Sequence, residues 1–277
     1  MRISVIIPCF DSAAWLPATL HSVLAQTLPP SDVELVLVDD GSRDATPQLL
    51  RQAVAEHPER AIRCVFQQNA GVAAARNRGI SLARGRYILP LDADDLLAPT
   101  MLEACAAVLD AAPEVDLVYT DREEFGDVQA TWSTGRFELA RLKYFNQLSA
   151  CSLYRRTLWE RVGGYRLNVD GFDDWDLWIA AAARGMRARH LPQALFRHRK
   201  RGDSQLRQLL PRYEALFARV ILNNREVYAA HEVEAAQRFL DTGEVAPFLR
   251  SARFVFMGHF LGRFPGAART EIPPCAT

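Results

Sequence analysis

Short apolar runs alternate with longer segments of helical periodicity between residues 3 and 121. The apolar runs span 3–8, 33–40, 62–68, 86–92 and 115–121, and the helical segments between them span 13–26, 45–56, 72–83 and 101–111. Strands that are separated by crossover helices pair in parallel. The pattern therefore predicts an α/β fold with a Rossmann-like, mostly parallel central sheet that is flanked by helices.

The pattern changes after residue 121. Residues 122–144 follow no single period, whereas "ACSLYRRTLWERVGGY" and "GFDDWDLWIAAAARG" predict a strand, a helix, a glycine turn and a second helix. Beyond Arg201 the pattern is mostly helical. We therefore expect a main domain at 1–203, with halves at about 1–121 and 122–203, and a helical C-terminal extension at 204–277.

The composition argues against several classes of protein. The 277 residues include 33 basic and 33 acidic side chains, so no net charge favours binding to nucleic acid. The five cysteines are scattered without CxxC spacing, which argues against disulfide frameworks and thiolate zinc sites. No apolar stretch reaches the roughly 18 to 20 residues of a membrane span, and the N-terminal run lacks a signal-peptide pattern. We expect a cytoplasmic protein, at most peripheral at the inner face of the membrane.

Polar residues follow the predicted strands, at the edge where parallel sheets bind ligands. The strongest cluster is "DADD", in which Asp92 and Asp94 leave the same side of an extended backbone. Two carboxylates without a nearby Cys or His favour a hard cation, Mg²⁺ or Mn²⁺. Asp95 is then expected to point away, as a cap. The alternative is that the whole cluster is a solvated helix cap.

Two other strand ends carry candidate ligand groups. In "DDGSRDAT", Asp40 can accept a hydrogen bond from a nucleobase, although an Asp-Gly turn needs no ligand. In "NAGVAAARNRG", Arg76 and Arg78, with Asn77 between them, are expected near the sheet edge, where they could meet a pyrophosphate. A solvated helix surface is the alternative for these arginines.

The last candidate group is "GFDDWDLW". Here Asp173 and Asp174 precede a helix that carries Trp175 and Trp178, which places carboxylates beside an aromatic surface. Because the helix dipole favours ionised carboxylates at this end, a capping role is the alternative to chemistry.

Taken in order, these stretches resemble the family 2 glycosyltransferases, inverting enzymes with a GT-A fold that use nucleotide diphosphate sugars. The resemblance rests on "SVIIPCFDSAAWLPATLHSVLAQT", "ELVLVDDGSRDAT", "NAGVAAARNRGISLARGRYILPLDADD", "NQLSACSLYRRTLWERVGGY" and "DDWDLW". Five ordered motifs are more specific than any one of them. The resemblance implies a nucleotide diphosphate sugar donor, first of all a UDP-sugar, and a carbohydrate or lipid-linked sugar acceptor. It also implies a place in bacterial cell-surface polysaccharide or glycolipid synthesis.

The same resemblance implies roles on the donor side. Pro8, Phe10 and Asp40 correspond to the nucleoside pocket, with Phe10 beside the base and Asp40 accepting its N–H. Arg76 corresponds to a residue that steadies the donor.

It also implies roles around the metal and the reacting hydroxyl. Asp92 corresponds to the ribose or metal side of the DXD motif, and Asp94 to a direct ligand of Mn²⁺ or Mg²⁺. Of the acidic pair, Asp174 is the expected catalytic base, with Asp173 beside it. His198 stands where some relatives have a further donor or metal contact, a structural role being the alternative.

Two other functions stay open at this point. A haloacid-dehalogenase-like phosphatase also has an Asp-x-Asp after a strand, but on its first strand, whereas this one follows the fourth. A degenerate sugar-nucleotide binding subunit is suggested by Asp173 in place of the usual Glu and by Ala180 in place of a common Arg. We expect residues 122–146 to cover the site and to vary with the acceptor.

The C-terminal segment "VAPFLRSARFVFMGHFLGRF" has an amphipathic helical pattern. The apolar positions on one face are Phe248, Ala252, Val255, Phe256 and Phe260. We expect this face to pack on the catalytic domain or on a second subunit of a homodimer. The alternative is binding to a membrane surface, with arginines at anionic headgroups.

Overall fold

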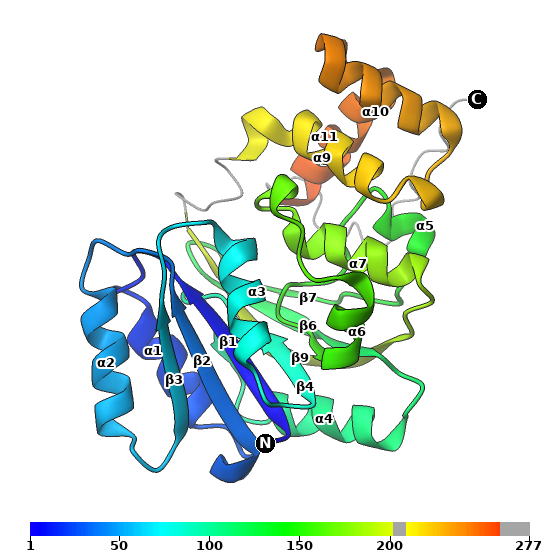
Figure 1. Ribbon diagram of the computed structural model, residues 1–277. Helices are drawn as coiled ribbons and strands as arrows, with labels where there is room; N and C mark the ends of the chain where they lie inside the picture. The colour runs from blue at the N-terminus through cyan, green and yellow to red at the C-terminus, as the bar shows by residue number, and fades with distance from the viewer. Residues whose placement is uncertain (202–208, 261–277) are drawn as a thin grey trace.

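The computed structural model describes residues 1–201 and 209–260, with side chains described up to residue 253. Its strands are β1 (Ile3–Cys9), β2 (Val33–Asp39), β3 (Ala61–Phe66), β4 (Tyr87–Pro90), β5 (Leu96–Leu97), β6 (Leu117–Gly126), β7 (Ala130–Trp132), β8 (Leu153–Arg155) and β9 (Ala188–Lys200). These strands form one sheet in the order β3-β2-β1-β4-β8-β6-β9-β5, with β7 paired to β6 (Figure 1).

The sheet is parallel in its first half and mixed in its second. β3, β2, β1 and β4 pair in parallel, as the strand–helix alternation predicts. β8 lies between β4 and β6 and is antiparallel to both, so β6 runs in the same direction as β4. The five predicted strands therefore share one direction, and their carboxyl ends meet at one edge of the sheet.

Helices cover both faces of this sheet. They are α1 (Leu16–Leu24), α2 (Thr46–Glu56), α3 (Val72–Leu82), α4 (Met101–Ala111), α5 (Leu139–Leu142), α6 (Arg156–Val162), α7 (Asp173–Ala183), α9 (Tyr213–Asn223), α10 (Ala230–Thr242) and α11 (Pro247–Phe260). The apolar residues of α1, α2 and α4 pack on one face, and those of α3, α6 and α7 pack on the other. Both faces of β1 and β2 are consequently buried, which explains their continuously apolar sequences.

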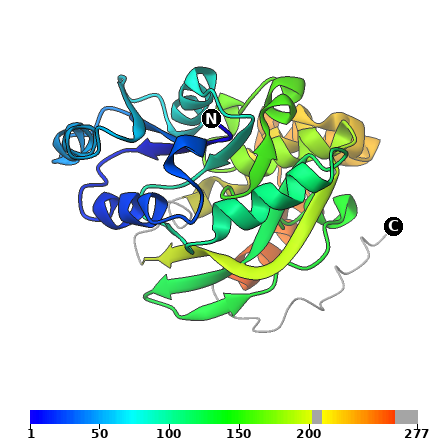
Figure 2. The same cartoon turned by 90° about the horizontal axis from the view of Figure 1, so that it is seen from below.

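Strand β9 is the longest strand among the described residues, and the sequence pattern did not predict it. It contains Pro192, and much of its length is exposed or half-buried, so it lacks the apolar run of the other strands. Figure 2 shows it as a long, curved strand. β9 runs parallel to β6, with a break in the register near Asp121. The end of β9 contacts the loop of residues 91–95 that follows β4, here called the acid-rich loop.

The helices after residue 208 extend the core of the second half of the chain. In Figure 1, α9, α10 and α11 lie beyond α7. The rings of Trp175 on α7 and Phe217 on α9 stack with centroids 5.2 Å apart. On α11, Leu249 and Ala252 are buried in the same core and Phe248 packs against it, so the first part of this helix is a packed element.

The remaining residues of the predicted apolar face, Val255, Phe256 and Phe260, lie outside the described side chains. In the described parts of the chain, no helix combines the length and the apolar character that crossing a membrane requires.

Candidate active site

The acid-rich loop after β4 is held by arginines from two other elements. The Arg76 guanidinium on α3 donates to Asp92 at 2.5 Å, and Arg201 after β9 forms an ion pair with Asp94 at 2.9 Å. Asp95 turns inward and accepts a hydrogen bond from the backbone N–H of Arg199 at 2.7 Å. Of the two expected roles of Asp95, a helix cap or a loop cap, the helix cap is wrong, because its carboxylate ties the loop to β9 and α4 begins after Thr100.

Arg76 joins the two acidic motifs that lie far apart in the sequence. Its side chain is 5% exposed, and it donates through Nη2 to Asp92 and through Nη1 to Asp173, each at 2.5 Å. Burial acts to lower the pKa of Arg76, but the charges of Asp92 and Asp173 raise it well above its usual value. Its Nε atom is buried and finds no hydrogen-bond partner in the described part of the chain. Arg76 thus stays charged inside the protein because two carboxylates surround it.

The other polar residues of this helix do not reach the site. Arg78 is exposed on the outer face of α3. The Asn77 side chain accepts from the backbone N–H of Tyr165 at 2.9 Å and donates to its carbonyl at 2.7 Å. The expectation that Arg78 lies beside Arg76 near a pyrophosphate is therefore wrong, since these residues point in different directions around the helix.

The two residues of the acidic pair have different environments. Asp173 is 2% exposed and bonded to Arg76, and its pKa is raised by burial although Arg76 opposes this. Asp174 is half-buried; burial, followed by the charge of Asp173, raises its pKa to about 7. A carboxyl group with a pKa near 7 can accept a proton in one step and lose it again near neutral pH. Asp174 is more exposed than Asp173 and, unlike Asp173, is not paired with Arg76, which favours Asp174 as the candidate base.

Asn146, the first residue of the motif "NQLSAC", contacts the predicted base, although the sequence analysis assigned it no role. Its Nδ2 donates to Asp174 Oδ2 at 3.0 Å. The Asp174 Oδ1 atom accepts from the backbone N–H of Trp175 at 2.7 Å. Because residues 122–146 have no regular period, only the folded chain reveals this contact.

The expected nucleoside pocket lies at the ends of β1 and β2. Phe10 is 47% exposed, which is unusual for a large apolar side chain beside a buried strand, and leaves its ring open to stack on a base. The turn after it is fixed, because Asp11 N donates to Ser42 at 3.0 Å and Asp11 accepts from Arg43 N at 2.7 Å. Pro8, half-buried at the end of β1, completes this edge.

Asp40 organises the neighbouring loop. Its carboxylate accepts from Gln67 Nε2 at 2.8 Å and from the backbone N–H groups of Ala70 and Gly71 at 2.9 Å each. Since a carboxylate has about four acceptor positions, it retains capacity for about one more donor. A contact to a base N–H stays a prediction for Asp40.

The acid-rich loop has the electrostatics of a cation site. Burial, followed by the charge of Asp92, raises the pKa of Asp94. Burial, followed by Asp94 and Asp92, raises the pKa of Asp95 well above its usual range. A dication near Asp92 and Asp94 would relieve this repulsion, and carboxylate oxygens suit Mg²⁺ and Mn²⁺. Across residues 1–201 and 209–260, no three His, Cys, Asp or Glu side chains converge, so such an ion would take most of its ligands from water and phosphate.

His198 lies on β9 with cationic neighbours. Its ring stacks on Phe196 with centroids 5.8 Å apart. Burial, followed by the charges of Lys200 and Arg122, lowers the pKa of His198 well below its usual value. The imidazole is therefore neutral at pH 7, which a metal ligand also requires. Its role as a donor or metal contact stays a prediction.

Other polar groups near these strand ends were missed by the sequence analysis. Asp39 has a buried Oδ1 without a hydrogen-bond partner among the residues that the structure describes. Arg199 donates to the Asp94 carbonyl at 2.8 Å and stacks on Trp15. The alternation of side chains along a strand puts Arg199 and Arg201 on one face of the "FRHRKR" segment, and a strand prediction there would have indicated this.

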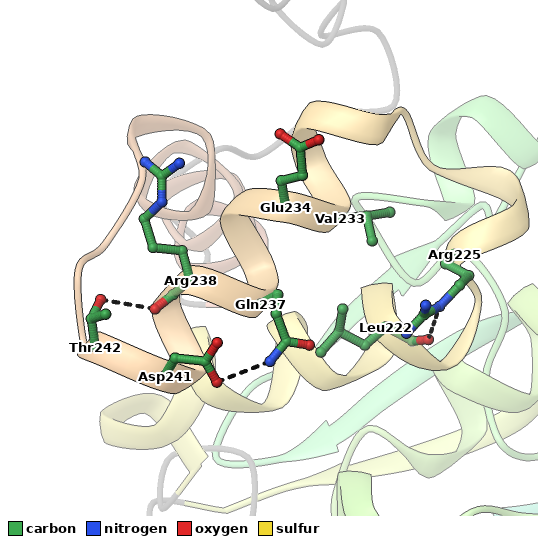
Figure 3. A pocket seen from close by; sticks show the side chains of 8 residues that line it. All are labelled: Leu222, Arg225, Val233, Glu234, Gln237, Arg238, Asp241 and Thr242. Atoms are coloured by element: carbon green, nitrogen blue, oxygen red, sulfur yellow. Dashed lines mark hydrogen bonds between the residues drawn. The ribbon is translucent and has the colours of Figure 1, made fainter.

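A hollow of about 450 Å³ between α9 and α10 is separate from this site (Figure 3). Its lining residues are Leu222, Arg225, Val233, Glu234, Gln237, Arg238, Asp241 and Thr242. None of them belongs to the acidic motifs, and Figure 3 shows the apolar side chains of Leu222 and Val233 among polar side chains of both charges. This hollow has no arrangement of groups that suggests chemistry.

Comparison with known proteins identifies the family. The sequence pattern described as Glycosyl transferase family 2 matches residues 4–167, more than half of the chain. The chain belongs to glycosyl transferase family 2. A PGL/p-HBAD biosynthesis glycosyltransferase of Mycobacterium tuberculosis is 38% identical over 179 residues, which cover 64% of this chain and 68% of the relative. The chondroitin synthase of Escherichia coli is 27% identical over 187 residues, 66% of this chain and 27% of that protein.

Solved structures show the same fold. TarS 1-349 from S. aureus, in complex with UDP-GlcNAc, superposes with a TM-score of 0.68 at 22% identity, over 96% of this chain and 82% of TarS 1-349. The mannosyltransferase PcManGT from Pyrobaculum calidifontis, in complex with GDP-Man and Mn²⁺, gives 0.65 at 21% identity, over 96% and 77% of the two chains. These structures confirm the GT-A fold. The family match and the relatives confirm the class of enzyme, a glycosyltransferase, and exclude the phosphatase alternative.

Replacing Arg76 by methionine should destabilise this family 2 enzyme strongly, because Asp173 would stay buried without its cation. Breaking a buried ion pair on one side costs on the order of 3–5 kcal/mol. Urea unfolding measures this, with Arg78→Met on the exposed face of α3 as the control, expected to change the free energy of unfolding by at most about 0.5 kcal/mol. Equal losses of unfolding free energy for the two variants would contradict a structural role for the bridge that Arg76 forms between Asp92 and Asp173.

Proposed function

We propose that this glycosyltransferase moves a sugar from a nucleotide diphosphate sugar, with UDP-sugars the first class to test, to an acceptor hydroxyl with inversion at the anomeric carbon. The observation that carries the proposal is the pairing of two acidic motifs through Arg76. This bridge supports the proposal because it joins the loop of Asp92 and Asp94, which would hold a diphosphate-bound cation, to the helix of Asp174, which would act as the base. Donor complexes of the structural neighbours, with UDP-GlcNAc and with GDP-Man, support the class of donor.

The donor would lie across the carboxyl ends of β1, β2 and β4. Phe10 would stack on the base, and Asp40, held by three donors, would accept one base N–H. Asp92 and Asp94 would hold Mn²⁺ or Mg²⁺, with His198 as a further candidate. When bound, the cation would neutralise the charge that develops on the leaving diphosphate.

Asp174 would remove the proton from the acceptor hydroxyl. As the acceptor oxygen bonds to the anomeric carbon, the bond from that carbon to the diphosphate oxygen breaks, and the proton passes to the Asp174 carboxylate. A single attack from the face opposite the leaving group inverts the anomeric carbon. One carboxylate suffices here, in contrast to the pair that glycoside hydrolases use.

The acceptor is proposed as a carbohydrate or a lipid-linked sugar, in the synthesis of bacterial cell-surface polysaccharide or glycolipid. The mycobacterial relative, whose name places it in PGL/p-HBAD biosynthesis, supports a glycolipid, and the chondroitin synthase supports a polysaccharide.

Donor binding should depend on the metal and on its carboxylate ligands. Calorimetry with UDP is expected to show binding in Mn²⁺ that largely disappears in EDTA or in Asp94→Asn, because the diphosphate would then face the Asp92 carboxylate without a cation. A panel that includes GDP identifies the base. UDP and GDP binding of equal strength with and without metal would contradict the assignment of the DXD motif.

Removing the base should stop transfer without weakening the donor. Asp174→Asn keeps the shape of the side chain, so we expect unchanged UDP affinity and a rate lower by about 10² to 10⁴. Because the base works only when deprotonated and its pKa is raised to about 7, the wild-type rate should fall as the pH drops below that value. Donor turnover is measured over a pH series for the wild type, Asp174→Asn and Asp173→Asn. A larger loss of turnover in Asp173→Asn would make Asp173 the base instead of Asp174. A wild-type protein that binds the donor without turning it over would be a degenerate binding subunit.

A further inference from the structure

We propose that Asn146 is a positioning residue for Asp174, one that holds the carboxylate of the base in a fixed rotamer through its side-chain amide. The assignment rests on the proposed role of Asp174 as the base. The central observation is the hydrogen bond from Asn146 Nδ2 to Asp174 Oδ2, 3.0 Å long, between segments 28 residues apart in the chain.

The amide of Asn146 has one hydrogen-bonded end and one unpaired end. Its Oδ1 atom is buried and has no hydrogen-bond partner within the described residues. Leaving a buried carbonyl unpaired costs free energy, typically about 1–3 kcal/mol. A flipped amide would place this oxygen against the Asp174 carboxylate, so the bond to Asp174 fixes the orientation of the amide.

The segment that leads to Asn146 is fixed by contacts with α7 and with the C-terminal extension. Trp175 Nε1 on α7 donates to the Leu142 carbonyl at 2.6 Å, and the Tyr228 hydroxyl donates to the Lys143 carbonyl at 2.8 Å. The Tyr144 hydroxyl donates to a carboxylate oxygen of Glu232 on α10. The chain is thus held over the three residues that come shortly before Asn146.

Glu232 links this segment to the C-terminal extension. It is 3% exposed, and its other oxygen accepts from the backbone N–H of Ala229 at the start of α10 at 2.8 Å. Lys143 lies 3.8 Å from the same oxygen. A buried carboxylate that is satisfied on both oxygens is a rigid support. The extension therefore contributes to the site through Asn146, although none of its described residues forms a hydrogen bond with Asp174.

The hydrogen bond also acts on the charge of Asp174. A donor to the ionised carboxylate favours that form and so opposes the effect of burial. The charged groups that act on Asp174 are Asp173 on its own helix, which raises its pKa, and Arg76 on α3, which lowers it. Removing the amide of Asn146 leaves both of these in place, so the change in titration reports on Asn146 alone.

The test compares Asn146→Ala with Gln147→Ala. Gln147 is the next residue on this segment and carries a buried amide, but it bonds to the backbone of Glu138 and Arg136, so its loss should disturb packing without touching the base. The titration of Asp174 is followed by carbon NMR of labelled aspartate in the full chain, with Asp174→Asn to assign the signal. In Asn146→Ala we expect the pKa of Asp174 to rise by about one unit, the size of one hydrogen bond to a charged group, and no rise in Gln147→Ala.

Turnover gives the second readout. The acidic limb of the pH–rate profile should move to higher pH by the same amount in Asn146→Ala, with the affinity for UDP unchanged, and the substitution should add no further loss in an Asp174→Asn background. An unchanged titration in Asn146→Ala, or an equal rise in Gln147→Ala, overturns the assignment. If the titration moves as expected but no donor is turned over by the wild-type enzyme, the proposed function fails while the contact of Asn146 with Asp174 stands.

Discussion

The rest of the site depends on the two ion pairs that the buried guanidinium of Arg76 forms. It holds Asp92 of the loop after β4 and Asp173 of α7 at 2.5 Å each. Charges of one sign cannot gather inside a protein without compensation, because the desolvation cost of each ion adds to their repulsion. One arginine between the two motifs offsets part of this cost and fixes their separation. Asp174 follows Asp173 in the chain, so its position is set by the same contact.

The other carboxylates of the site are also held by hydrogen bonds or ion pairs. Asp95 is tied to the backbone of β9, and Arg201 pairs with Asp94, so the acid-rich loop is fixed before any ligand arrives. On the other side, the side chain of Asn146 and the backbone of Trp175 donate hydrogen bonds to Asp174, the proposed base. A site that is organised in advance loses less free energy when the substrate binds and reacts. The buried charges therefore contribute more to holding the site residues in position than to the stability of the fold.

The sequence predicted the parts of this protein that follow a local pattern. Buried strands such as β1 and β2 are continuously apolar, and the acids at their ends identify the ligand-binding edge. It could not predict β9, whose half-exposed residues carry no apolar period. Nor could it predict that Arg76 meets Asp173, which lies 97 residues away, or that Asn146 meets the base, since such contacts depend on how distant elements pack.

A double-mutant cycle on Arg76 and Asp173 tests the central claim most directly. The free energy of unfolding is measured by urea denaturation for the wild type, Arg76→Met, Asp173→Asn and the double variant. If Arg76 is buried because it pairs with Asp173, removing both charges should cost less than the sum of the single losses, by an interaction energy of about 1–3 kcal/mol. Single losses that add to within about 0.5 kcal/mol would show that the two side chains are not coupled, and the bridge that joins the donor and acceptor sides would have to be abandoned.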